Sequence, residues 1–470
     1  MSNKFLTLDQ ETIIALSTPK GSGAIAVIRL SGDDSFEIVD KVSRLSANKK
    51  IINCETHTIE HGFIVNNKTN SIIDEVLFFI MRAPRTFTGQ NTIEISCHNN
   101  SFIIENIINE SILAGARLAK LGEFTQRAFL NGKIDLVQAE SINDLIHAQT
   151  ELAVKKSMLQ VKGSLSNFIL EIEESLLYIL ALTEGSFEFF EQEVQDLDIN
   201  NLIKNNINNL LEKLNNLKNN FNVQQQIKNG IKISLIGLVN AGKSTLFNSI
   251  LGHDRAIVTQ VAGTTRDVIE SSLYKNGNFW QLTDTAGLRE TNDVIEKEGI
   301  TRSLEQAEIS DIILLVVDSS CKLTKEQIKI YKQIIDKYKQ KIIFVANKFD
   351  IKDSTEILNY LKTVFDVNFL PVSGKNKFGV NLLEIEIENI IQKNFAELRS
   401  PFLLNKRQLN LIIELIDGIK FIENNLLKNF EYEIVAHHVK SLLESVLELT
   451  GKNVNEKMLD KIFKDFCIGK

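Results

Sequence analysis

The sequence predicts a multidomain protein of the α/β and α classes, with an N-terminal α+β domain, a helical domain, and an α/β domain inserted into the helical one. The chain has 470 residues, and at ~150 residues per domain it has room for about three. Short β-rich runs come first, and apolar residues at helical spacing follow from Leu136. Continuous apolar strands, typical of a covered parallel sheet, begin at Ile231, and helical spacing returns after Pro401.

Composition excludes several classes of protein. Hydrophobic content of 43% and charged content of 24% exclude a mainly disordered chain. The net charge of −7 excludes a uniformly basic nucleic-acid binder. Apolar runs such as Leu176 to Leu182 are too short for a membrane span, which needs ~18 residues, and the N-terminus lacks the apolar core of a signal peptide. Four scattered cysteines without a CxxC pair fit a reducing cytoplasm and favour neither disulfides nor a zinc site. We therefore expect a cytoplasmic protein with no membrane contact.

The first domain is expected over residues 1–133. Its apolar alternation predicts helices near Asp34–Leu45 and Ser101–Ala114. Strands are predicted at Thr12–Ser17, Ala24–Leu30, Ile59–Val65, Glu75–Met81 and Thr92–Cys97.

The helical domain is expected in two parts, residues 134–229 and 393–470. Leu136, Ala139 and Ile142 begin a helical pattern that almost no glycine or proline interrupts before Gly185. The Asn-rich segment Asn200–Asn222 keeps leucines at helical spacing, so it is also predicted to be a helix.

The inserted domain is expected over residues 230–392. Its strand Ile231–Ile236 runs into Gly237-Leu-Val-Asn-Ala-Gly242-Lys243-Ser244, which matches the phosphate-binding pattern GxxxxGK[ST]. A helical run follows, as this motif requires. Backbone N–H groups and the helix N-terminus would hold phosphate oxygens, Lys243 would reach the β- and γ-phosphates, and Ser244 would bind Mg²⁺.

Further motifs select GTP. Asp284-Thr285-Ala286-Gly287 follows a predicted strand and is placed for Mg²⁺ and the γ-phosphate. Asn347-Lys348-Phe349-Asp350 follows the strand Lys341–Ala346, and its Asp350 carboxylate can accept the two N–H donors of a guanine edge, which adenine lacks. Ser373-Gly374-Lys375 would lie beside the base. These elements predict a Ras-like GTPase domain. The expected GTP-binding residues are Asn240, Ala241, Gly242, Lys243, Ser244, Thr245, Thr259, Gln260, Val261, Ala262, Gly263, Thr264, Thr265, Asp284, Thr285, Ala286, Gly287, Asn347, Lys348, Asp350, Ser373, Gly374 and Lys375.

The segment Gly263–Asp267 lies where a switch loop belongs, and Thr265 is the expected switch ligand of Mg²⁺. Leu288 stands where Ras-like GTPases carry the glutamine that orients water. Leucine cannot orient water, so the catalytic group must come from elsewhere. Glu290, Glu296 and Glu298 are the nearby candidates.

An arginine finger is not obvious in this domain, although Arg266 and Arg289 are possible. A monovalent cation could supply the same charge. We expect K⁺ to be held by Asn240, Thr259, the Val261 carbonyl and Thr264.

These motifs together resemble the MnmE (TrmE) family of bacterial tRNA modification GTPases, over essentially the full length. The resemblance extends to Ile25–Gly32, Phe87–Glu94, Gly122–Lys133 and the ending Cys467-Ile-Gly-Lys470. The P-loop differs, with Val239 where the family commonly has proline, and Gly374 stands where alanine is usual. Neither change removes a ligand atom.

The resemblance implies a GTP-hydrolysing enzyme that works with the FAD-dependent protein MnmG. Together they would add an aminomethyl or carboxymethylaminomethyl group to C5 of the wobble uridine of certain tRNAs, using formyl- or methylene-tetrahydrofolate. It implies folate binding by Arg29, Glu94, Lys133 and Lys470, a catalytic Glu296 beside Lys243 and Thr265, and a thiol, Cys467, near the reaction site. It also implies a homodimer, whose G domains pair during hydrolysis, and a heterotetramer with MnmG.

Two alternatives stay open at this point. A GTP-dependent ribosome-assembly factor that binds rRNA would share Leu288 but lack the folate motifs. A folate enzyme of the aminomethyltransferase type would use its G domain only for regulation.

The densest clusters of basic residues in the N-terminal half are expected to contact tRNA phosphates weakly. These residues are Arg82, Arg85, Arg117, Lys120, Arg127 and Lys133.

Overall fold

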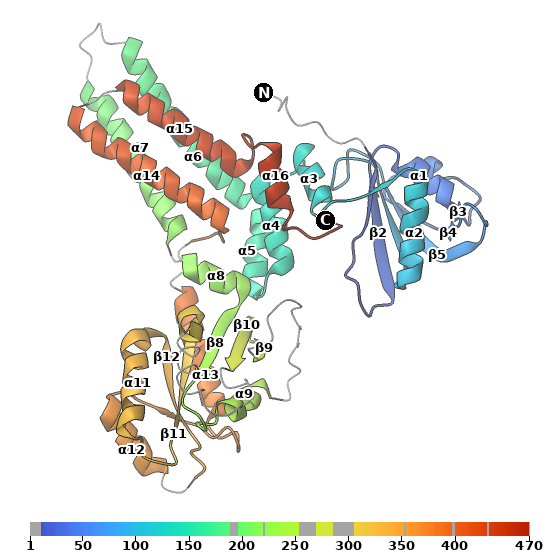
Figure 1. Cartoon of the computed structure of the whole chain (residues 1–470). Helices are drawn as coiled ribbons and strands as arrows, with labels where there is room; N and C mark the ends of the chain where they lie inside the picture. Colours follow the sequence, from blue (N-terminus) through green and yellow to red (C-terminus); the bar gives the residue numbers. More distant parts are fainter. Residues whose placement is uncertain are drawn as a thin grey trace. The chain divides into compact units, whose positions relative to one another are not determined.

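The computed structural model describes residues 11–188, 196–219, 221–252, 269–284, 305–351, 354–396, 400–429 and 432–469. The chain forms two compact units, one of Met1–Asn143, Met158–Leu211 and Asn410–Lys470, the other of Asp144–Ser157 and Glu212–Leu409. Figure 1 labels most of the elements of both. No helix among the described residues is both long and apolar enough to cross a bilayer.

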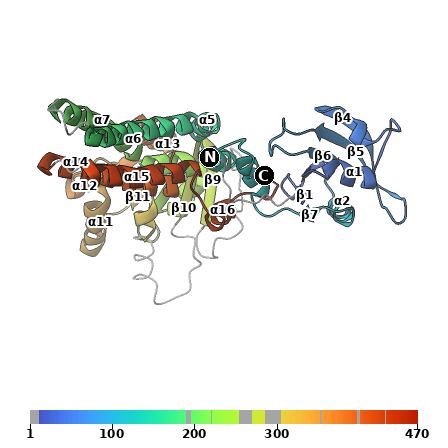
Figure 2. The ribbon, with the colours of Figure 1, turned by 90° about the horizontal axis from the view of Figure 1, so that it is seen from above.

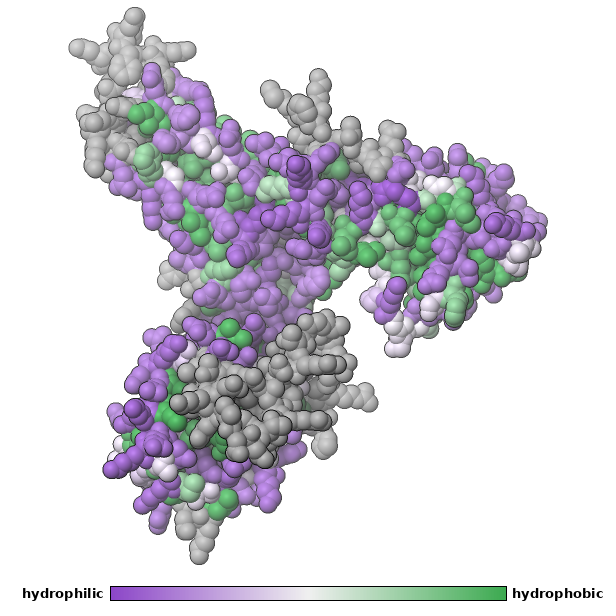
Figure 3. Space-filling model, in the orientation of Figure 1, coloured by the Kyte–Doolittle hydropathy of each residue, from purple (hydrophilic) through white to green (hydrophobic). Residues whose placement is uncertain are grey.

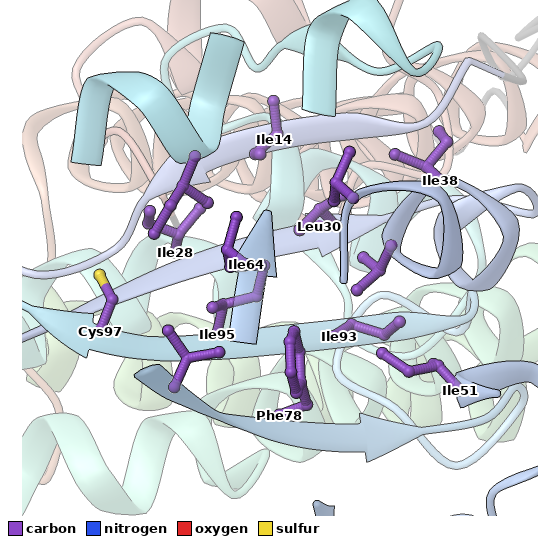
Figure 4. Packing of buried hydrophobic residues seen from close by; sticks show 14 of the residues in the cluster. Ile14, Ile28, Leu30, Ile38, Ile51, Ile64, Phe78, Ile93, Ile95 and Cys97 are labelled. Atoms are coloured by element: carbon purple, nitrogen blue, oxygen red, sulfur yellow. The ribbon is translucent and has the colours of Figure 1, made fainter. Parts of the chain in front are cut away.

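The N-terminal domain is built on a seven-stranded sheet with the order β3-β4-β5-β6-β2-β1-β7. The helices α1 (Ser35–Val42) and α2 (Ser101–Leu113) cover one face, where isoleucines from alternate strand positions meet them. Figure 4 shows this core, with Ile28, Ile95 and Phe78 among its side chains. The strands are β1 (Ile13–Leu16), β2 (Ile25–Ser31), β3 (Ser43–Leu45), β4 (Thr58–Val65), β5 (Ile72–Met81), β6 (Thr92–His98) and β7 (Arg117–Leu118), with a short 3-10 helix η1 (Ile51–Asn53).

The other face of this sheet has no covering helix over β4, β5, β6 and β2 in the part of the chain that the structure describes, and it is called the open face below. Ile59 and Leu77 are 59% and 41% exposed there, and Phe79 stands directly opposite Ile59, two residues from Leu77 on β5. The β1 side is covered, where Phe124 of α3 (Glu123–Leu130) packs on Ile13. Figure 3 shows apolar residues gathered over the N-terminal domain in the view drawn.

The five predicted strands of this domain are confirmed to within a few residues. The predicted helix Asp34–Leu45 is too long, because Ser43–Leu45 leaves the helix to pair with Gly62–Ile64 as β3. The strands β3 and β7 were not predicted, since three and two residues are too short to show alternation.

The helical elements lie before and after the inserted domain in the sequence. The helix α6 runs alongside α15 in both Figure 1 and Figure 2. It continues through Gly185, because the packing of a long apolar face outweighs the ~1 kcal/mol cost of one glycine. The other helices are α4 (Leu136–His147), α5 (Glu151–Val161), α6 (Ser164–Glu188), α7 (Asp196–Lys218), α8 (Phe221–Asn229), α14 (Lys406–Asn429), α15 (Tyr432–Thr450) and α16 (Glu456–Phe463).

The inserted domain has a six-stranded sheet with the order β13-β12-β11-β8-β10-β9, parallel except for β9. Apolar clusters cover both of its faces, which confirms the predicted α/β class. Its elements are β8 (Ile231–Ile236), α9 (Lys243–Leu251), β9 (Ile269–Lys275), β10 (Asn278–Asp284), β11 (Ile312–Asp318), α11 (Lys325–Tyr338), η2 (Lys339–Lys341), β12 (Ile342–Asn347), α12 (Ser354–Phe365), β13 (Leu370–Pro371) and α13 (Val380–Ala396).

Candidate functional site

The phosphate-binding loop joins β8 to α9, as the motif requires. Asn240 and Gly242 both have positive φ, 63° and 83°. A Cβ on Gly242 would overlap the Asn347 amide, so glycine is needed there for close approach as well as for its backbone angle. Gly242 is also the residue before the first turn of α9, so the loop ends at a helix N-terminus that favours phosphate.

Lys243 lies folded across this loop. Its Nζ donates to the carbonyls of Gly237 and Leu238 at 2.8 and 2.9 Å, and the residue is only 7% exposed. Ser244 and Thr245 are exposed on the first turn of α9. The arrangement places an ammonium group and a hydroxyl at the edge of the sheet where the strands end.

Three loops meet at Asn347, the last residue of β12, which is 2% exposed. Its Nδ2 donates to the carbonyls of Ala241 and Gly242 at 2.9 and 3.2 Å, and its Oδ1 accepts from the Gly374 N–H at 3.1 Å. The structure therefore brings the phosphate loop, the segment 347–350 and the segment 373–375 together.

Asp350 is the residue expected to recognise guanine. The Ser373 hydroxyl donates to its Oδ1 at 2.7 Å, and this hydrogen bond lowers the pKa of Asp350. The carboxylate is exposed and ionised at neutral pH, so it can accept two N–H donors. Lys375 lies in the same loop and is also exposed.

The backbone of Asp284 pairs with Leu235 of β8, so it lies at the same edge of the sheet as the phosphate loop. The remaining predicted residues lie outside the described residues. They are Thr259, Gln260, Val261, Ala262, Gly263, Thr264, Thr265, Arg266, Thr285, Ala286, Gly287, Leu288, Arg289, Glu290, Glu296, Glu298 and Lys470.

The second site lies on the N-terminal sheet. Arg29 of β2 stands opposite Glu94 of β6, and its Nη2 lies 2.6 Å from Glu94 Oε1. Its Nη1 donates to the carbonyl of Gly469 at 2.9 Å. Arg29 therefore joins Glu94, its ion-pair partner, to a backbone carbonyl 440 positions away in the sequence.

The C-terminal segment reaches this pair because Gly469 packs closely on the strand end. The Ser17 hydroxyl donates to the Gly469 carbonyl at 3.2 Å. With φ of 87°, a Cβ on Gly469 would stand 2.6 Å from the Leu16 carbonyl oxygen. Cys467, two residues earlier, is half-buried, and its carbonyl accepts from the Gly122 N–H.

Lys133 lies against the loop that precedes β6. Its Nζ donates to the Pro84 carbonyl at 3.0 Å, and its side chain approaches Gly89. Within that loop Thr88 shares a 2.7 Å hydrogen bond with Ser31, two residues after Arg29. Lys133 is thus tied to the same open face as Arg29 and Glu94.

Only some of the basic residues predicted to contact tRNA have exposed and unengaged charged groups. Arg127 is 2% exposed and donates to Glu123, and Arg117 pairs with Glu123 and Glu11. Burial raises the pKa of Glu123, but the hydrogen bonds from Arg117, Lys120 and Arg127 outweigh this effect and lower the pKa overall. Glu123 therefore engages both arginines within the fold. Phosphate contacts predicted for Arg127 are wrong, because its guanidinium is buried.

Two residues at the nucleotide site were not predicted. Asp318 pairs with Lys348 at 2.6 Å. Tyr331 accepts the Leu238 N–H with its hydroxyl at 3.1 Å and donates to the Val316 carbonyl at 3.0 Å. The position of Asp318 directly after an apolar strand was a usable signal, since such residues gather at one sheet edge.

The described residues contain no group of three His, Cys, Asp or Glu that could hold a metal ion.

Comparisons with known proteins extend these observations. A family model described as the MnmE helical domain matches residues 136–467, and one described as the GTP-binding protein TrmE N-terminus matches residues 12–133. The structure of an Era variant from Aquifex aeolicus bound to GDP·AlF4− is 26% identical over 34% of this chain and 56% of that chain, with a TM-score of 0.28.

Relatives match over the full length. The tRNA modification GTPase MnmE of Flavobacterium johnsoniae is 37% identical, covering 98% of this chain and all of that protein. The protein of the same name in Alkaliphilus oremlandii is 35% identical, covering 98% and 99%. Because these relatives match at 35–37% identity over nearly the whole chain, and both family models match as well, this protein belongs to the tRNA modification GTPase MnmE family.

Proposed function

We propose that this GTPase acts with an FAD-dependent MnmG protein to add an aminomethyl or carboxymethylaminomethyl group to C5 of the wobble uridine of certain tRNAs. The one-carbon unit comes from formyl- or methylene-tetrahydrofolate. The observation that carries the proposal is the meeting of Arg29, Glu94 and Gly469 on the open face of the sheet. A GTPase needs no such site for hydrolysis alone.

The chemistry of these residues suits a folate. A pterin ring presents N–H donors, which the Glu94 carboxylate can accept, and the glutamate tail presents carboxylates, which suit the cations of Arg29, Lys133 and Lys470. The side chains of Arg29 and Glu94 are 19% and 23% exposed, so they are accessible to a ligand yet held by their mutual bond. Cys467 belongs to the C-terminal segment that completes this region.

Calorimetry with 5-formyl-tetrahydrofolate tests the site. We expect Arg29→Ala, Glu94→Ala and Lys133→Ala each to lower folate affinity and to leave GTP hydrolysis unchanged. Glu60→Ala is the matched control, because Glu60 also lies on this sheet and pairs with an exposed lysine, Lys49. Normal folate binding in all three variants would discard the site.

Nucleoside analysis of tRNA from a deletion strain tests the reaction. We expect the modified wobble uridine to disappear and to return when the gene is restored. An unchanged wobble uridine contradicts the proposed function.

For hydrolysis we propose that Lys243 contacts the β- and γ-phosphates, Ser244 and Thr265 bind Mg²⁺, and Glu296 positions the attacking water. The exposed Ser244 hydroxyl beside Lys243 fits an Mg²⁺ ligand. Glu296→Ala is expected to reduce turnover with little change in nucleotide affinity, since it acts in the transition state. Greater damage from Glu290→Ala or Glu298→Ala would move the assignment.

We also propose that K⁺ assists hydrolysis, bound by Asn240, Thr259, the Val261 carbonyl and Thr264. Asn240 supports this, because its side chain is exposed on the phosphate loop and carries an amide oxygen. Turnover in KCl is expected to exceed turnover in NaCl, and G domains are expected to associate only in KCl with a transition-state analogue. Equal behaviour in both salts contradicts K⁺ binding.

The proposed organisation is an N-terminal domain over 1–133, a G domain over 230–392, and a helical domain from 134–229 and 393–470. In the cell we propose a cytoplasmic homodimer that forms a heterotetramer with MnmG and binds tRNA weakly without it.

A further inference from the structure

Asp318 ends β11 beside the base edge of the nucleotide site. In the sheet it stands opposite Asn347, the last residue of β12. The next residue, Ser319, donates to the Asn347 carbonyl through both its N–H and its hydroxyl, at 2.9 and 2.7 Å. The two strand ends are therefore fixed to each other, and Asp318 has a defined position relative to Lys348.

The carboxylate of Asp318 is fully engaged on this edge. Its Oδ2 lies 2.6 Å from Lys348 Nζ, and its Oδ1 accepts the N–H and the hydroxyl of Ser320 at 2.8 and 2.6 Å. Burial raises the pKa of Asp318, but the hydrogen bonds from Lys348 and Ser320 outweigh it and lower the pKa overall. The group therefore carries a negative charge at neutral pH.

Lys348 has its backbone in the left-handed region, with φ of 66°. Few residues other than glycine and asparagine adopt this backbone conformation, so the surrounding loop determines it. The backbone conformation fixes the Cα–Cβ direction of Lys348, and the ion pair with Asp318 fixes the position of its Nζ. A four-carbon side chain held at both ends loses less conformational freedom when a ligand binds.

We propose that Asp318 is a positioning residue for guanine nucleotides, which holds Lys348 in the geometry that the base requires. The inference rests on the proposed base site, and it deepens that proposal by adding a residue outside the recognised motifs. Because Asp318 acts on the base side, it affects GTP and GDP alike. It has no part in the chemistry at the γ-phosphate.

The test measures the Kd of fluorescent GDP and of a non-hydrolysable GTP analogue on the full chain, together with turnover. Asp318→Asn is expected to weaken both nucleotides about tenfold, the effect of losing one charge-assisted hydrogen bond. Turnover at saturating GTP is expected to stay unchanged. The double variant Asp318→Asn, Lys348→Met is expected to bind no more weakly than Lys348→Met alone, because Asp318 acts through the lysine.

Asp311→Asn is the matched control. Asp311 lies just before the opposite end of β11, where its carboxylate accepts from the Lys232 N–H and the Gln226 amide. We expect it to leave nucleotide affinity unchanged, even if it lowers thermal stability. If Asp318→Asn does not fold by circular dichroism, the same cycle is measured with Asp318→Glu.

The outcomes separate the two proposals. If Lys348→Met weakens binding and Asp318→Asn does not, the positioning role is overturned while the base site stands. Additive losses in the double variant, or a fall in turnover with unchanged Kd, also overturn it. If Lys348→Met itself leaves guanine affinity unchanged, the base site is wrong, and the positioning role fails with it.

Discussion

Asn347 shows how one buried amide organises the nucleotide site. Its donors are directed to the phosphate loop and its acceptor to the segment 373–375, so the amide ties both of these segments to the end of β12. An unpaired buried amide would cost ~1–3 kcal/mol, which favours the single arrangement in which all its partners are present. The sequence predicted Asn347 as a ligand residue, whereas in the structure it also ties the loops together.

Asp350→Asn is expected to shift nucleotide preference from GTP toward xanthosine triphosphate. A carboxylate can accept the two N–H donors of guanine, whereas the amide presents a donor that suits the xanthine carbonyl. Competition between the two nucleotides for the purified chain measures the shift. Retained preference for GTP would show that Asp350 does not face the base.

Tyr331→Phe is expected to destabilise the G domain by about 1–3 kcal/mol, because it leaves the part-buried Leu238 N–H and the buried Val316 carbonyl without the tyrosine hydroxyl. The KM for GTP is expected to rise, since Leu238 belongs to the phosphate loop. Urea denaturation and steady-state kinetics measure both. Tyr274→Phe is the control, because Tyr274 is 53% exposed. Equal stability of the two variants would contradict the bridging role.

At the scale of elements, the strands that carry a long apolar pattern were predicted from the sequence, and the shortest strands were missed. Strands such as Ile231–Ile236 were predicted at their observed bounds because continuous apolar residues mark a buried strand. The strands β3 and β7 depend on pairing with distant residues, which no local pattern reveals. Asp318 was missed for a related reason: its partner, Lys348, is close only once β11 and β12 pair.

The docked C-terminal segment gives an element-scale prediction. Gly469→Ala places a methyl group 2.6 Å from the Leu16 carbonyl oxygen and puts alanine at φ of 87°. The segment is expected to undock, which lowers folate affinity about tenfold, or ~1.4 kcal/mol, without changing GTP hydrolysis. Calorimetry and a phosphate-release assay measure the two.

Gly21→Ala is the control for this change. Gly21 also has a positive φ, but a Cβ there has no neighbour within 4 Å. We expect its folate affinity to match that of the unaltered chain. Equal affinity in the Gly469 variant would show that the segment is not part of the folate site.

At the scale of the whole molecule, the open face of the N-terminal sheet requires an explanation. One face is sealed by α1 and α2, while the other presents Ile59, Leu77 and Phe79 around the Arg29–Glu94 pair. Large exposed apolar patches on soluble domains mark interaction surfaces. A second copy of the chain, expected from the family resemblance, offers the same apolar surface and would bury it symmetrically.

Leu77→Asp is therefore expected to convert a dimer into a monomer. Leu77 stands opposite His61 on β4 and Ser96 on β6, in the middle of the open face, so a carboxylate there would be desolvated in a dimer. Light scattering after size exclusion measures the mass, expected at about twice 53.1 kDa for the unaltered chain. Phe102→Asp is the matched control, because Phe102 is 77% exposed on α2, the helix that covers the opposite face. A dimer that survives Leu77→Asp but dissociates with Phe102→Asp would assign the interface to the helical side, and a monomeric unaltered chain would remove the dimer altogether.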